Sequence, residues 1–169
     1  MPTWKEVTAA NPAHSENFAR KWKMLAAQGK DIHGEARLVD AMVERGSLIL
    51  DAGCGTGRLG GELVNRGHKV VGVDVDPILI SHAEHDFPDG QWVVGDLSED
   101  EIPEGNFDLV VSAGNVMTFL AVDGREAAMR NIYNSRHSDG RFVVGFGEGR
   151  GWAFDDFLTL AKEVGFRVD

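Results

Sequence analysis

The chain has 169 residues, 43% of them hydrophobic, and carries a formal net charge of −10. Its length fits a single domain with a substantial core, and its acidity disfavours sequence-independent binding of nucleic acid, which needs a basic surface. It contains no apolar run long enough for a membrane span, no signal-peptide pattern, and one cysteine, Cys54, which has no internal partner, so we expect a cytoplasmic protein.

The first third of the chain predicts two amphipathic helices, over residues 15–28 and 34–45. Apolar side chains recur along each at helical spacing, and a glycine follows each pattern. We expect residues 1–46 to form a helical cap packed on a core formed by residues 47–169, as one structural domain overall.

After residue 46, apolar runs alternate with amphipathic runs. The expected strands are Ser47–Asp51, Lys69–Asp74, Gln91–Gly95, Phe107–Ser112 and Arg141–Phe146. The expected helices are Arg58–Arg66, Pro77–Asp86, Arg125–Arg136 and Ala153–Val164. This alternation predicts an α/β fold, a doubly wound and mostly parallel sheet with helices on both faces.

The first expected strand runs directly into a loop with three glycines at alternate positions, Gly53, Gly55 and Gly57. Glycines remove the side chains that would keep a ligand away from the backbone. The N–H groups of such a loop and of the helix after it are free to face a ligand. We interpret the loop as a ligand cradle.

Gly55, Gly57 and Gly60 also fit the dinucleotide fingerprint, which keeps an NAD-dependent oxidoreductase as an alternative. The strand before the loop ends in a carboxylate, Asp51, which would repel a pyrophosphate. A ligand with an ammonium and a sulfonium would instead be attracted to it. S-adenosylmethionine is such a ligand.

Two more acids, Asp74 and Asp96, follow the ends of the next two expected strands. The carboxyl ends of parallel strands lie on one edge of a sheet, where open α/β sheets bind ligands. An acid after the second strand typically accepts hydrogen bonds from ribose hydroxyls, and one after the third strand can accept from an adenine amino group.

With these features in order, the sequence resembles the class I S-adenosylmethionine-dependent methyltransferases of small-molecule type. Residues 51–57 look like the first motif of the family, 73–74 the second, 95–97 the third and 107–117 the fourth. The resemblance implies that Asp74 binds ribose, that Asp96 and Leu97 border the adenine, and that the glycine loop holds the methionine part. The candidate cofactor-binding residues are Asp51, Ala52, Gly53, Cys54, Gly55, Gly57, Asp74, Val75, Asp96, Leu97, Asn115 and Arg20.

Two of these candidates have competing interpretations. Asn115 either contacts the cofactor or substrate or has a plain loop role. Arg20 either meets the cofactor carboxylate from a lid or belongs to a helix face. No catalytic residue is identified, and His14 is a speculative general base. We expect Cys54 to fill space and predict no metal site.

The sequence thus predicts methyl transfer from S-adenosylmethionine to a small-molecule acceptor, with S-adenosylhomocysteine as product. A non-catalytic S-adenosylmethionine-binding regulatory module remains a second alternative. We expect no membrane partner and no nucleic acid, and a homodimer is compatible with the sequence. The family's sixth strand would begin where the sequence stops, and its C-terminal strand hairpin is missing, which leaves Arg141–Phe146 as an expected edge strand.

Overall fold

The computed structural model describes all 169 residues. It contains one five-stranded sheet in the order β3-β2-β1-β4-β5, and every neighbouring pair is parallel. The strands are β1 (Leu48–Ala52), β2 (Lys69–Asp74), β3 (Gln91–Val94), β4 (Phe107–Ser112) and β5 (Arg136–Val144). The predicted α/β fold class is confirmed, and β5 lies at an edge of the sheet.

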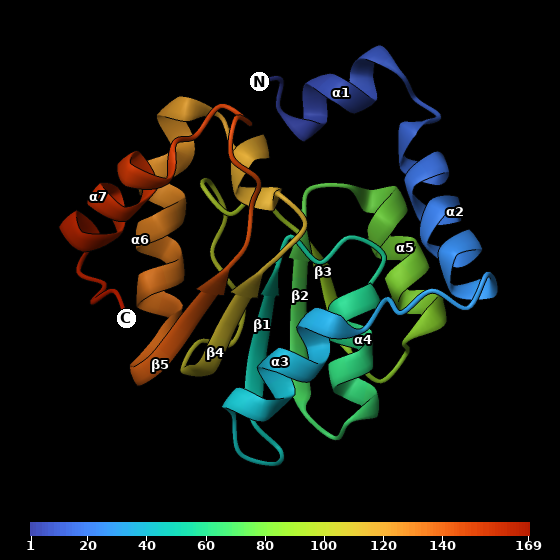
Figure 1. Cartoon of the computed structure of the whole chain (residues 1–169), viewed down its shortest axis with the longest axis horizontal. Helices are drawn as coiled ribbons and strands as arrows, with labels where there is room; N and C mark the ends of the chain where they lie inside the picture. The colour runs from blue at the N-terminus through green and yellow to red at the C-terminus, as the bar shows by residue number, and fades with distance from the viewer.

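The sheet lies between two layers of helices (Figure 1). The α-helices are α1 (Trp4–Ala10), α2 (His14–Ala27), α3 (Gly34–Met42), α4 (Arg58–Asn65), α5 (Pro77–Asp86), α6 (Arg125–Ser135) and α7 (Phe154–Val164). Two short 3₁₀ helices, η1 (Val116–Phe119) and η2 (Val122–Gly124), follow β4. None of these helices has the length and apolar character that a bilayer crossing requires.

The alternation of side chains along each strand produces two cores. Leu50 packs in one buried cluster with Met129 of α6, and its neighbour Ile49 packs in the other with Leu63 of α4. Because both faces of the sheet are covered, the strands are almost continuously apolar, which is the pattern that made them visible in the sequence.

Two element predictions need correction. The last strand was expected to begin at Arg141 but begins at Arg136, because the imidazole of His137 bonds to Asp108 of β4 over 2.9 Å and pairing with β4 continues through a register shift. The first helix, α1, was not predicted. Its signal was present, since Thr3 and Glu6 form a reciprocal capping box.

The amino-terminal helices lie on the side of the molecule that carries β1, β2 and β3. In Figure 1, α1 lies above the upper ends of these strands, α2 lies along α5, and α3 lies beside α4. The carboxyl ends of the strands and the amino-terminal helices together enclose the candidate site.

Candidate cofactor site at the carboxyl edge of the sheet

A cavity of about 740 Å³ opens at the carboxyl ends of the strands. Nine of the predicted cofactor-binding residues line it, namely Asp51, Gly53, Cys54, Gly55, Asp74, Val75, Asp96, Leu97 and Asn115. Ala52, Gly57 and Arg20 are not among its lining residues. The topology therefore brings residues from four separate strand ends to one space, as the parallel sheet predicted.

The glycine loop has a backbone conformation that favours glycine. Gly53 has a φ of 81°, and a Cβ at this position would overlap the side chain of Val116. Val116 lies in η1, immediately after β4, and also lines the cavity. Because Gly53 has no side chain, the Val116 side chain packs directly against the backbone of the loop after β1. This contact forms the floor of the cavity.

Asp74 is fastened to the glycine loop. Its Oδ2 accepts a hydrogen bond from the Gly55 N–H at 2.9 Å, and its Oδ1 accepts one from the Asp76 N–H at 2.9 Å. Each carboxylate oxygen has two lone pairs, so one on each oxygen stays available to a ligand. Burial raises the pKa of Asp74 to about 6, although these two backbone donors lower it.

Asp51 lies at the end of β1 with only 3% of its surface exposed. Its Oδ2 accepts from the Gly60 N–H at 3.0 Å. Burial raises its pKa to about 7, while the Gly60 hydrogen bond and the nearby Arg58 charge oppose this shift. Gly60, the third glycine of the dinucleotide fingerprint, thus binds the carboxylate at the end of β1 through its backbone N–H.

Asp96 has an ion pair that the sequence did not predict. Its Oδ2 lies 3.1 Å from Nζ of Lys5 in α1, and its Oδ1 accepts from the Ser98 N–H and hydroxyl. Burial favours a raised pKa, but the Ser98 and Lys5 hydrogen bonds outweigh it and hold the pKa of Asp96 below its usual value. The residue predicted to border the adenine therefore also forms an ion pair with a side chain of α1.

Aromatic rings cover the cavity. The ring of Trp4 lies 5.5 Å from that of Phe18 in α2 and 5.3 Å from that of Phe119 in η1, and all three residues line the cavity. Their edge-to-face arrangement is a favoured packing mode for aromatic rings. We call Trp4, Phe18 and Phe119 the aromatic roof. Sequence analysis did not find Trp4 or Phe119.

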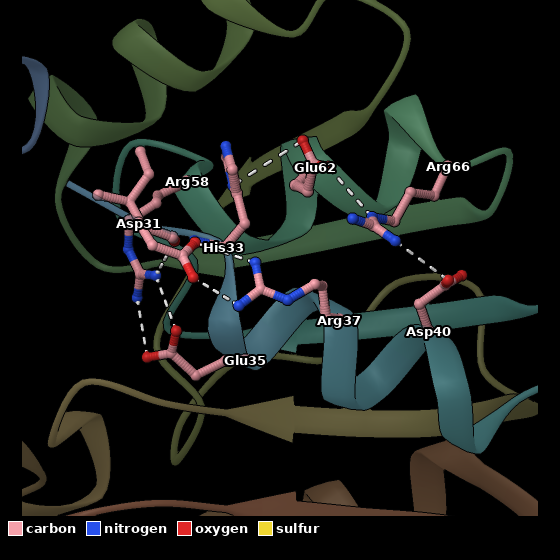
Figure 2. Close-up of polar contacts among 9 residues, drawn as sticks. Asp31, His33, Glu35, Arg37, Asp40, Arg58, Glu62 and Arg66 are labelled. Carbon is pink, nitrogen blue, oxygen red and sulfur yellow. Dashed lines mark hydrogen bonds and ion pairs between the residues drawn. The ribbon is translucent and has the colours of Figure 1, made fainter. Parts of the chain in front are cut away.

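The cationic residue at the α4 side of the cavity is Arg58. Its guanidinium lies 4.2 Å from the centre of the Trp22 ring, donates to the Ile32 carbonyl at 2.8 Å and pairs with Glu35 at 3.1 Å. Figure 2 shows Arg58 and Glu35 pointing toward each other from α4 and α3. A separate series of ion pairs, His33–Glu62–Arg66–Asp40, also joins these helices. Trp22, Glu35 and Arg58 all line the cavity.

Arg20, the predicted partner of the cofactor carboxylate, lies elsewhere. Its side chain is exposed on α2 and donates to Asn17 at 3.3 Å, on a separate shallow depression. The next residue, Lys21, does line the cavity. A helix turns by about 100° per residue, so a small error in judging the inward face selects the wrong side chain.

The remaining candidates have structural partners. Asn115 accepts a hydrogen bond at its Oδ1 from the Gly147 N–H at 2.6 Å, which ties the segment after β4 to the glycine-rich loop after β5. His14 packs against Trp4 at 5.0 Å between ring centres but is not among the lining residues.

Burial raises the pKa of the Cys54 thiol well above its usual value, which makes it a poor nucleophile. No group of three or more histidine, cysteine or acidic side chains is arranged to hold a metal ion.

A glycine loop, acids at three successive strand ends and one roofed cavity define a Rossmann-like domain that binds a nucleoside-containing ligand. Residues 49–140 match the family model described as a methyltransferase domain. The structure of a TehB-like SAM-dependent methyltransferase from Corynebacterium glutamicum is 64% identical, with a TM-score of 0.89, over 92% of this chain and 84% of that chain.

More distant relatives agree with this match. An uncharacterized methyltransferase of Mycobacterium tuberculosis is 39% identical over 48% of this chain and 43% of its own length. A SAM-bound structure of an amino pentose methyltransferase from Micromonospora echinaspora is 26% identical, with a TM-score of 0.64, over 73% of this chain and 54% of that chain. This chain therefore spans less than half the length of the mycobacterial relative. It belongs to the class I S-adenosylmethionine-dependent methyltransferases, as its four motifs predicted.

Proposed function

We propose that this chain binds S-adenosylmethionine in the roofed cavity and transfers its methyl group to a small-molecule acceptor, releasing S-adenosylhomocysteine. One observation carries the proposal: Asp51, Asp74 and Asp96, which lie at the carboxyl ends of three different strands, line the same cavity as the glycine loop. Its volume of about 740 Å³ leaves room for an acceptor beside the cofactor.

The donor set fits the cofactor. Asp74 has a free lone pair on each oxygen for the ribose hydroxyls, and the buried Asp51 offers a negative charge to the ammonium at the other end. Arg58, with its guanidinium held over Trp22 and against Glu35, supplies a cation for the carboxylate, the role that sequence analysis gave to Arg20.

When bound, S-adenosylmethionine supplies a methyl carbon already activated by its sulfonium. The protein's task is then to orient the acceptor and to exclude water from the transfer path. The aromatic roof of Trp4, Phe18 and Phe119 excludes water, and Asn115 holds the loop after β5 against the cavity wall. No covalent protein intermediate is needed.

The acid-rich composition supports a small-molecule acceptor over a nucleic acid, since the net charge of −10 would repel phosphates. The free, buried Cys54 supports a location in the reducing cytoplasm.

Calorimetric titration of the purified chain with S-adenosylmethionine, S-adenosylhomocysteine and NAD tests the cofactor. We expect saturable binding of the first two and none of NAD. A screen of small molecules and of RNA, read out as S-adenosylhomocysteine formed, then tests the acceptor class. Binding without turnover on any acceptor would favour a non-catalytic binding module, and binding of NAD alone would overturn the proposal.

A further inference from the structure

Asp76 is a buried carboxylate whose contacts reach beyond its own helix. Only 5% of its surface is exposed, and it does not line the cavity. Sequence analysis did not count it among the cofactor-binding residues. Its Oδ1 accepts from the N–H groups of Ile78 and Leu79, so it is the N-cap of α5.

The other oxygen of Asp76 holds the amino-terminal helices. Its Oδ2 accepts from Nε1 of Trp4 in α1 at 2.8 Å and from the hydroxyl of Ser15 in α2. Four donors fill the four lone-pair positions of the carboxylate. A buried charge needs such complete pairing, so α1, α2 and α5 must be in place together for Asp76 to be satisfied.

The backbone of Asp76 contacts the cofactor site. Its N–H donates to Oδ1 of Asp74 at 2.9 Å, and the other oxygen of Asp74 accepts from Gly55. Asp76 therefore binds α1 and α2 through its side chain and orients the proposed ribose-binding carboxylate, Asp74, through its backbone N–H.

Beyond the packing of the Trp4 ring on Phe18, Phe119 and His14, few contacts attach α1 to the core. None of its seven residues is buried, and its capping box of Thr3 and Glu6 stabilises the helix itself without attaching it to the core. The Lys5 side chain of the Lys5–Asp96 pair is 62% exposed, and pairs of this kind contribute little to stability. The hydrogen bond from Trp4 to Asp76 is therefore the principal buried polar attachment of α1.

We propose that Asp76 is a positioning residue that couples closure of the aromatic roof to the orientation of Asp74, so that a bound cofactor and a closed roof stabilise each other. This inference rests on the proposed function. The Trp4 and Ser15 contacts to Asp76 favour the orientation of Asp74 that binds the ligand. Ligand binding should therefore in turn stabilise these contacts and the position of α1 and α2.

The test compares three variants with wild type. Ser15→Ala removes one donor to Asp76 without changing a cavity-lining residue, and Trp4→Phe removes the other while keeping an aromatic ring. Glu16→Gln is the matched control. The Glu16 carboxylate lies 2.9 Å from Nε2 of His82 and so joins the same two helices, α2 and α5, without contacting Asp76. The measurements are the dissociation rate of S-adenosylhomocysteine and the hydrogen exchange of residues 4–10 with and without this ligand.

We expect S-adenosylhomocysteine to slow exchange across residues 4–10 in wild type and in Glu16→Gln. Ser15→Ala and Trp4→Phe should lose most of this slowing and release the ligand about tenfold faster. A merely structural role would change exchange equally with and without ligand. The coupling would be overturned if the ligand does not change hydrogen exchange of residues 4–10 in wild type. It would also be overturned if the variants keep both the slowed exchange and the wild-type dissociation rate. If wild type binds neither S-adenosylmethionine nor S-adenosylhomocysteine, the proposed function itself fails.

Discussion

The carboxylate of Asp74 and the backbone of Gly55 are joined by a hydrogen bond of 2.9 Å, which connects the end of β2 to the loop after β1. The two sides of the cofactor cavity are therefore fixed to each other in the protein itself. Because Asp74 also keeps lone pairs for a ligand, we expect its removal to affect both the loop and the proposed ribose contacts.

Replacing Asp74 with alanine should weaken S-adenosylmethionine binding by roughly 10- to 150-fold, since hydrogen bonds to a charged acceptor contribute about 1.5–3 kcal/mol. Isothermal titration calorimetry measures this change. Asp89→Ala, which removes an exposed carboxylate in the turn before β3, is the control and should bind like wild type. Wild-type affinity in Asp74→Ala would contradict the assignment of Asp74.

Stability should fall as pH rises from about 4 to 7. Burial raises the pKa of Asp51 to about 7 and that of Asp74 to about 6, whereas an unfolded aspartate titrates near 3.9. Within this window the folded protein binds more protons than the unfolded chain, so raising the pH favours unfolding. Urea unfolding at a series of pH values measures the effect. Asp51→Asn, which cannot ionise, should stabilise the protein more at pH 7.5 than at pH 4.5.

The same ionisation should strengthen cofactor binding. As Asp51 loses its proton, its negative charge becomes available to the ammonium of the ligand, and the affinity for S-adenosylmethionine should rise from pH 5 to 7.5. In Asp51→Asn this rise should shrink to the part that comes from Asp74, whose pKa burial raises to about 6. Titration calorimetry at both pH values decides the question, and an unchanged pH dependence in the variant would assign the rise to another group.

Gly53→Ala should destabilise the fold more than Gly67→Ala does. Both glycines have a positive φ, 81° and 90°, so each alanine pays about 1–2 kcal/mol of backbone strain. Only at Gly53 does the new Cβ overlap Val116, whereas nothing lies within 4 Å at Gly67. We expect a further loss of about 1–3 kcal/mol, with impaired cofactor binding. Thermal unfolding of the two variants measures the difference, and equal melting temperatures would argue against a tight loop.

Arg58→Ala should weaken S-adenosylmethionine binding about tenfold or more, and Arg20→Ala should leave it unchanged. Arg58 lines the cavity between Trp22 and Glu35, while Arg20 faces away from it. Titration with the cofactor checks both variants. Each variant removes one positive charge, so the change in net charge is the same in both. The opposite order of effects would restore Arg20 to the site.

Local patterns in the sequence determined the core of the fold. The apolar runs of β1, β2 and β4 and the spacing of Gly53, Gly55 and Gly57 depend on neighbouring residues only, because a strand buried on both faces must be apolar throughout. The convergence of Asp51, Asp74 and Asp96 followed as well, since parallel strands end on one edge.

Contacts between distant residues decided the rest. The start of β5 depends on His137 reaching Asp108. The packing of α2 and α3 against α4 places Arg58 in the cavity wall and Arg20 outside it. The roof formed by Trp4, and its attachment to Asp76 across 72 positions of sequence, arises only when α1 folds over the sheet. Periodicity shows that a helix has an inner face, but the partner that this face meets is set by tertiary packing, whose contacts leave no local pattern in the sequence.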